Sequence, residues 1–109
     1  MSVRRFGQRI RLRPDAIAEY ERLHTAPWPG VLAQIRRSNI QNYTIFRDGL
    51  ELFASFEYTG DDFASDMAAM AADPETQRWW ALTDALQEPL PDREPGSWWK
   101  AIDEIFHVD

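Results

Sequence analysis

The sequence of 109 residues contains no cysteine, and no apolar run in it approaches the roughly 20 residues of a membrane-spanning helix. Without cysteine the chain forms no disulfide and no thiolate metal site, which fits a reducing compartment. Arg4 and Arg5 are not followed by an apolar stretch, so we find no signal peptide. These absences predict a cytoplasmic protein without a membrane segment.

Histidine and glycine are also scarce, with two and five residues respectively. His24 and His107 do not have the spacing of metal ligands, and there is no glycine-rich phosphate loop. A serine nucleophile would need a base and an orienting group that the sequence does not identify. Twelve basic residues against eighteen acidic ones give a net charge of −6, which does not attract nucleic acid. We therefore expect no metal, no cofactor, no covalent catalysis and no nucleic-acid partner.

Aromatic residues, in contrast, are abundant: they make up 13% of the chain and include five tryptophans. Such a surplus suggests a flat or sugar-like ligand or an aromatic interface, and extra core packing is the alternative. The length fits one domain, residues 1–109. A domain of this size has a modest core, so oligomerisation would supplement its stability.

Alternating residues predict the strands. Phe6, Ile10 and Leu12 share one parity, and the arginines between them form the exposed face of a strand at 3–12. Asp48-Gly49 separates two segments rich in aromatic and β-branched residues, which predicts a hairpin of strands 41–47 and 50–57 with a type I′ turn. The alternating tail predicts a last strand at 100–108, after a proline-rich loop at 89–97.

Apolar residues at helical spacing predict helices in the segments between these strands. The first covers 15–25, the second begins near Trp28 and ends at about Arg37, and the third covers 61–72. Asp73-Pro74-Glu75 combines an N-cap, a proline at N1 and an acid at N2, so another helix begins there. Its predicted inner stripe consists of Trp79, Leu82 and Leu86.

The resulting order, β-α-α-β-β-α-α-β, is close to the split βαβ arrangement. It predicts an α+β, ferredoxin-like fold with a four-stranded antiparallel sheet and helices on one face. The other face of such a sheet needs a cover, and two sheets packed face to face would provide it. We therefore expect a homodimer, a dimeric α/β barrel.

Tyr20, His24 and Trp28 follow one another at intervals of four residues, and residues four apart lie on one helical face. Histidine has an unperturbed pKa near 6.5, which suits proton transfer at neutral pH, although a lone histidine near a helix end also serves as a cap or as packing. Pro27 and Pro29 interrupt the helix, so Trp28 is interpreted as a packing anchor rather than a member of the site.

Other aromatic residues are candidates for ligand contacts. Adjacent residues on a helix cannot both face the core, so one of Trp79 and Trp80 should lie at the edge of a pocket, where a sugar could stack. Core and interface packing explain this pair equally well. Asn42-Tyr43 could reach a ligand, or could reflect only turn chemistry and strand propensity. Trp98-Trp99 is interpreted as packing or dimer contact, and His107 lies at an interface or a pocket mouth.

Several segments together resemble the L-rhamnose mutarotase family, and the resemblance covers nearly the whole chain. The matching segments are Arg13 to His24, Trp28-Pro29, Asn42-Tyr43, Gln77-Arg78-Trp79-Trp80 after Asp73-Pro74, and Asp103 to His107. The family often has an acidic residue after Trp-Pro, where this chain has Gly30. The loop before the tail also differs from the family's pattern.

The resemblance implies a homodimeric ferredoxin-like α/β barrel without a cofactor, an isomerase that interconverts the α and β anomers of a monosaccharide. By position, His24 would be the proton donor, and Tyr20, Tyr43, Trp79 and Trp80 would bind the sugar. L-Rhamnose and L-fucose, both 6-deoxy-L-sugars, are the candidate substrates. Two alternatives remain: a cofactor-free monooxygenase on the same barrel, and a regulatory module that binds a sugar or an aromatic ligand without turnover.

Overall fold

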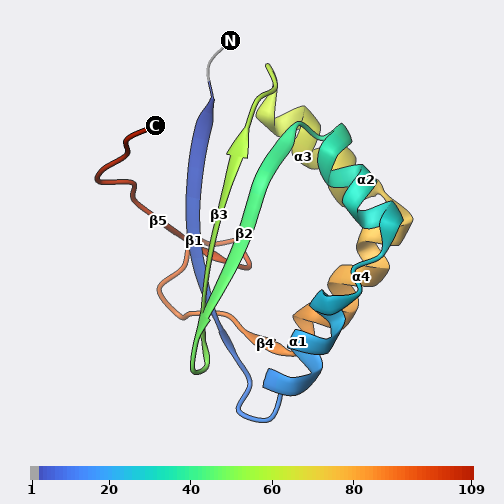
Figure 1. Cartoon of the computed structure of the whole chain (residues 1–109), viewed down its shortest axis with the longest axis vertical. Coiled ribbons are helices and arrows are strands. Elements are labelled where there is room, and N and C mark those ends of the chain that lie inside the picture. Colours follow the sequence, from blue (N-terminus) through green and yellow to red (C-terminus); the bar gives the residue numbers. More distant parts are fainter. Residues whose placement is uncertain (1–2) are drawn as a thin grey trace.

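The computed structural model of the chain describes residues 3–109. Its helices form one layer against one side of the sheet, as Figure 1 shows. The elements, in chain order, are β1 (Arg4–Leu12), α1 (Ile17–Thr25), α2 (Pro29–Arg37), β2 (Ile40–Asp48), β3 (Glu51–Tyr58), α3 (Phe63–Ala72), α4 (Pro74–Asp84), β4 (Gln87–Glu88) and β5 (Lys100–Ile102).

The antiparallel sheet has the strand order β2-β3-β1-β4, and β5 also pairs with β1. β3 pairs along nearly the whole of β1, whereas the short strands β4 and β5 share the other edge of β1 at different heights. The predicted α+β, ferredoxin-like sheet with helices on one face is therefore confirmed. None of the helices within residues 3–109 is long and apolar enough to cross a bilayer.

The hairpin between β2 and β3 is confirmed, but its predicted type I′ turn is wrong. Asp48 pairs with Glu51, so the two central residues are Gly49 and Leu50 rather than Asp48 and Gly49. Only Gly49 has a positive φ, 60°, whereas a type I′ turn needs two such residues. Strand pairing thus extends one residue further than the Asp-Gly signal suggested.

The core lies between the sheet and the helices. Ile10 and Leu12 of β1, Leu52 of β3 and Tyr20 of α1 are buried together in one cluster. Because alternate strand residues point to opposite faces, Gln8 also points toward the helices. The helix-covered face of β1 therefore carries a polar side chain beside the apolar core.

The start of α4 is capped as predicted: the Asp73 carboxylate accepts hydrogen bonds from the backbone N–H and the hydroxyl of Thr76. The predicted inner stripe is only partly right. Trp79 is buried, but Leu82 is exposed, and the residues that pack inward with Trp79 are Thr76 and Thr83. The second expected leucine, Leu86, follows the end of α4 and packs against the buried core cluster, as predicted.

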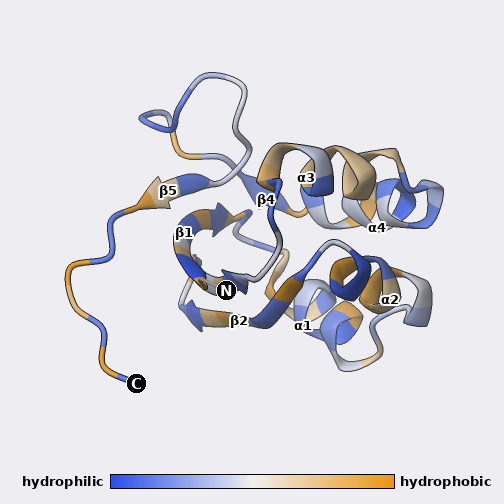
Figure 2. Ribbon diagram, turned by 90° about the horizontal axis from the view of Figure 1, so that it is seen from above, coloured by the Kyte–Doolittle hydropathy of each residue, from blue (hydrophilic) through white to orange (hydrophobic). Residues whose placement is uncertain are grey.

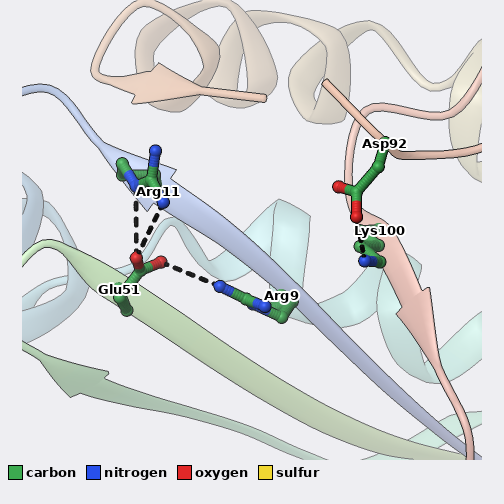
Figure 3. A network of polar contacts seen from close by, with 5 residues as sticks. All are labelled: Arg9, Arg11, Glu51, Asp92 and Lys100. Carbon is green, nitrogen blue, oxygen red and sulfur yellow. Dashed lines mark hydrogen bonds and ion pairs between the residues drawn. The ribbon is translucent and has the colours of Figure 1, made fainter. Parts of the chain in front are cut away.

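The arginine face of β1 lies opposite the helices, as predicted. Arg9 and Arg11 both pair with Glu51 of β3, and Lys100 pairs with Asp92 (Figure 3). The hydrogen bonds from Arg11 hold the pKa of the Glu51 carboxyl below its ordinary value. This face of the sheet thus carries a paired charge network that has no helix over it.

The predicted last strand at 100–108 is mostly wrong. Only Lys100–Ile102 pairs with β1, and residues 103–109 leave the sheet as an extended, exposed segment (Figure 2). The side chain of Ile105 is 95% exposed and that of Phe106 is 79% exposed. Alternating residues favour a strand, but a strand forms only where an adjacent strand supplies hydrogen-bond partners for its backbone.

Candidate functional site

Tyr20 and His24 of α1 meet Trp79 of α4 in an aromatic cluster, which Trp28, the N-cap of α2, completes by packing on Trp79. The rings of Tyr20 and His24 lie 4.3 Å apart, centroid to centroid, one helical turn from each other. His24 meets Trp79 edge to face at 5.4 Å, and Trp28 meets the same tryptophan at 5.3 Å. Tyr20 and Trp79 are buried, whereas His24 is exposed, so its imidazole is accessible to a ligand.

One hydrogen bond determines the tautomer of His24. Its Nδ1 lies 2.7 Å from the backbone carbonyl oxygen of Tyr20. A carbonyl only accepts, so Nδ1 carries a proton and donates it. Nε2 is then the nitrogen that gains or loses a proton. His24 also lies in the last turn of α1, one turn after Tyr20.

Tyr43, which is 41% exposed, lies on the helix-covered face of the sheet because of a β-bulge. The pairing of β2 with β3 is interrupted between Gln41 and Thr44, and Asn42 there has a positive φ of 51°. The extra residue reverses the alternation, so Ile40 and Tyr43 both face the helices. The Asn42 side chain donates a hydrogen bond to Glu57 that holds the bulge in place.

The surroundings of Tyr43 combine apolar and polar groups. Its ring stacks on Phe56 at 5.5 Å, and its hydroxyl lies 3.4 Å from the amide nitrogen of Gln8. Desolvation raises the pKa of Tyr43 to about 12, so the hydroxyl keeps its proton at neutral pH. Burial, and secondarily the charge that Tyr43 would carry if ionised, raises the pKa of Tyr20 as well.

Trp80 is not part of the aromatic cluster. Its side chain is 38% exposed and makes no aromatic contact within residues 3–109. It lies about 100° round α4 from Trp79, as expected for adjacent helical residues. Of the five predicted site residues, the structure therefore brings together Tyr20, His24 and Trp79, places Tyr43 opposite them on the sheet, and leaves Trp80 at the edge.

Asp84 is a candidate that the sequence reasoning missed. It ends α4, one turn after Trp80, and its partly buried carboxylate has no hydrogen bond or ion pair within the described residues 3–109. Burial raises its pKa, and its charge in turn raises the pKa of Tyr20. An acid in the last turn of a helix opposes the helix dipole, and this local conflict was the available signal.

Gln87 was also missed. It is 2% exposed, donates a hydrogen bond to the Tyr20 hydroxyl at 3.1 Å and accepts one from the indole N–H of Trp98 at 2.8 Å. Trp98 and Gln87 both lie far from Tyr20 in the sequence, so no spacing pattern links them. The other tryptophan of that pair, Trp99, packs against the buried core cluster.

The remaining surface features do not share the chemistry of this site. A hollow of about 530 Å³ lies between the sheet and the C-terminal segment and includes Arg5, Glu57 and His107. Another of about 480 Å³ lies between α2 and β2. His107 is paired with Asp109 in the exposed tail. No group of three metal-binding side chains occurs in the part of the chain that the structure describes.

A ferredoxin-like sheet covered on one face by helices, with a histidine beside aromatic rings and a tyrosine that faces them from the sheet, defines the fold and the candidate site of this chain. The family model for L-rhamnose mutarotase matches residues 5–108. The chain therefore belongs to the L-rhamnose mutarotase family, whose members are isomerases that act on carbohydrates.

Relatives and one solved structure agree with this membership. An L-fucose mutarotase of Xanthomonas campestris is 37% identical over 97% of this chain and 89% of its own length. L-Rhamnose mutarotases of Burkholderia orbicola and Phocaeicola vulgatus are 34% and 31% identical, over 93% and 90% of this chain and 94% and 91% of their own lengths. The crystal structure of an L-rhamnose mutarotase from Formosa agariphila superposes with a TM-score of 0.75 over 97% of this chain and 99% of that one, at 21% identity, so this likeness concerns the fold.

Proposed function

We propose that this protein interconverts the α and β anomers of a 6-deoxy-L-sugar, L-rhamnose or L-fucose. The observation that carries the proposal is the exposed imidazole of His24, held between Tyr20 and Trp79 with its Nδ1 bound to a carbonyl. The named relatives act on these two sugars. The absence of cysteine from the sequence is compatible with the cytoplasm, where we place the enzyme.

In the proposed mechanism, His24 is the proton donor. Protonated at Nε2, it gives that proton to the ring oxygen while the bond between this oxygen and C1 breaks. The anomeric hydroxyl loses its proton and becomes the aldehyde oxygen. Rotation about the C1–C2 bond, followed by closure on the other carbonyl face and return of both protons, yields the other anomer. General acid–base catalysis of this kind contributes about 10²–10⁴ in rate.

Asp84 is our candidate for the group that accepts the anomeric proton. Tyr43 does not suit this role, because its hydroxyl remains protonated until a pH of about 12. The Asp84 carboxylate lies in the same environment as Tyr20 and has no cationic partner within residues 3–109 that would compete for it. A partly desolvated carboxylate is a better base than a solvated one, since its pKa is raised.

The remaining predicted residues would bind the sugar. Tyr20 and Tyr43 keep their protons and would donate hydrogen bonds to sugar oxygens. The half-exposed indole of Trp80 and the edge of Trp79 offer apolar surface on which the C6 methyl of a 6-deoxy sugar would rest. These roles explain why one Trp of the pair is buried and the other lies at the edge.

Anomeric exchange rates across a panel of sugars test the proposed function. Saturation-transfer NMR at the anomeric protons should show faster exchange of L-rhamnose or L-fucose with the protein than without it. D-Glucose, which has a hydroxyl where these sugars have a methyl at C6, should respond at least tenfold less. Binding of a sugar without faster exchange would instead identify a binding module and refute the enzyme.

We also propose that the protein works as a homodimer. The sheet face opposite the helices exposes large apolar side chains: Phe46 is 63% exposed, and Phe53 lies beside it in the β2–β3 pairing. Ile102 and the exposed tail add to the same side of the molecule (Figure 2). An uncovered apolar surface of this kind marks a protein interface, and a second sheet fits it.

Substitution of Phe46 by aspartate should convert the dimer to a monomer, because an unpaired charge would be buried in the proposed interface. Light scattering should give about twice 12.7 kDa for the native chain and the single mass for the variant. Leu82→Asp is the matched control, since Leu82 is 44% exposed on the helical side and its replacement should leave the dimer intact. A native chain that stays monomeric at micromolar concentration would refute the dimer.

A further inference from the structure

Trp98 directly follows the proline-rich loop at 89–97, and the proposed function assigns it no role. Its indole N–H donates a hydrogen bond of 2.8 Å to Oε1 of Gln87. The other end of the same amide, Nε2, lies 3.1 Å from the Tyr20 hydroxyl oxygen. Gln87 and Tyr20 are both buried, at 2% and 4% exposure, whereas Trp98 is 38% exposed, so the bond between the amide and the Tyr20 hydroxyl is the one shielded from solvent.

The chemistry of these three groups leaves one arrangement of hydrogen atoms. An indole nitrogen only donates, so the amide oxygen of Gln87 must face Trp98. The amide nitrogen then faces Tyr20 and donates, and the Tyr20 oxygen accepts. The proton of the Tyr20 hydroxyl therefore points away from Gln87, and no acceptor for it lies within hydrogen-bond distance among residues 3–109.

The free hydroxyl proton belongs to the site that the aromatic cluster forms. The Tyr20 ring contacts that of His24, its carbonyl accepts a hydrogen bond from Nδ1 of that histidine, and Tyr43 lies on the sheet face that the helices cover. A buried hydroxyl with an unused proton beside the acid–base group is suited to an oxygen acceptor on a ligand.

We propose that Trp98 and Gln87 are positioning residues that set the direction of the Tyr20 hydroxyl, so that it donates a hydrogen bond to a sugar oxygen in the site. This inference rests on the proposed function. It adds a specificity rule: the substrate must place an oxygen acceptor, a ring oxygen or a hydroxyl, opposite Tyr20. It also gives the loop at 89–97 a role, because the loop delivers the indole that orients the amide.

Gln87→Glu is the most direct test, because a carboxylate only accepts. It would still accept from Trp98, but would also take the Tyr20 proton that the sugar needs. We expect the Kd for the preferred sugar, measured by tryptophan fluorescence, to rise about tenfold. Trp98→Phe removes the donor, leaves the amide free to flip, and should raise the Kd about threefold. Trp99→Phe is the matched control and should leave it unchanged.

A double-mutant cycle separates this role from a purely structural one. Tyr20→Phe should weaken sugar binding about tenfold in the native chain but less than twofold in the Gln87→Glu background, where the hydroxyl no longer faces the sugar. Gln87→Met is a second variant for the case that the buried Glu destabilises the fold. Methionine does not take the Tyr20 proton, so Gln87→Met should bind the sugar at least threefold more tightly than Gln87→Glu. In ¹H–¹⁵N spectra, the Trp98 indole signal should move upfield in Gln87→Met and stay downfield in Gln87→Glu.

The outcomes distinguish the two proposals. The role of Gln87 alone is overturned if the native chain accelerates exchange of the sugar but Gln87→Glu binds the sugar as tightly as the native chain. In that case Tyr20→Phe would also raise the Kd by the same factor in both backgrounds. A native chain that neither binds nor exchanges any sugar of the panel overturns the proposed function, and the donor role of Tyr20 with it.

Discussion

Replacement of His24 by alanine is expected to abolish catalysed anomeric exchange while the chain still folds. The imidazole is the acid–base group of the aromatic cluster, and its removal eliminates the proposed proton donor. The loss should be about 10²–10⁴-fold, the usual contribution of general acid–base catalysis. His24 is exposed and makes one hydrogen bond, to Tyr20, so the free energy of unfolding should fall by only about 1 kcal/mol.

Saturation-transfer NMR measures the exchange, and thermal unfolding followed by circular dichroism measures the fold. His107→Ala is the control, because His107 lies in the exposed tail and pairs only with Asp109, so exchange should remain at the native rate. Exchange that continues unchanged in His24→Ala would remove His24 from the mechanism.

The pH dependence of anomeric exchange tests Asp84 as the acceptor of the anomeric hydroxyl proton. Burial raises the pKa of Asp84, and a carboxylate acts as a base only above its pKa. As the pH is lowered, the exchange rate should therefore begin to fall at a higher pH than it would if the base were an ordinary Asp with a pKa near 3.9. Asp84→Asn should lower the rate at least tenfold and remove that acid limb. A variant that keeps both the rate and the limb would exclude Asp84 as the base.

Replacement of Trp79 by alanine should impair both stability and exchange. Trp79 is 7% exposed and lies against both His24 and Trp28. Truncation of a buried Trp costs about 3–5 kcal/mol, which is a large part of the stability of a small domain. Exchange should fall at least tenfold even where the variant is folded, because the imidazole of His24 loses the ring that limits its orientation.

Trp80→Ala provides the contrast on the adjacent residue. Its side chain is 38% exposed and outside the aromatic cluster, so the loss of stability should stay below about 1 kcal/mol. Because Trp80 is proposed to bind the sugar, the Kd for the sugar should rise in Trp80→Ala without a change in folding. Denaturant unfolding and sugar titration of both variants test this. Equal losses of stability would contradict the division between a buried and an edge tryptophan.

Local features of the sequence predicted the elements well because their causes are local. The start of α4 depends on Asp73, whose carboxylate caps an N–H three residues on. The contact between the rings of Tyr20 and His24 follows from their spacing of four residues in α1. Errors arose where a contact with a distant segment decides the outcome. Leu82 has the correct spacing for the core but faces solvent, and residues 103–109 alternate like a strand but form no strand pairing within residues 3–109.

The sequence by itself thus determined the order of helices and strands, the ferredoxin-like topology and the pairing of Tyr20 with His24, since these depend on neighbours within a few residues. Only the tertiary structure decided that the bulge at Asn42 turns Tyr43 inward, and that Gln87 and Trp98 meet the Tyr20 hydroxyl. The physical reason is that hydrogen-bond direction and burial depend on the groups that surround a side chain. In this protein those groups come from segments up to 78 residues away in the sequence, the separation of Tyr20 and Trp98.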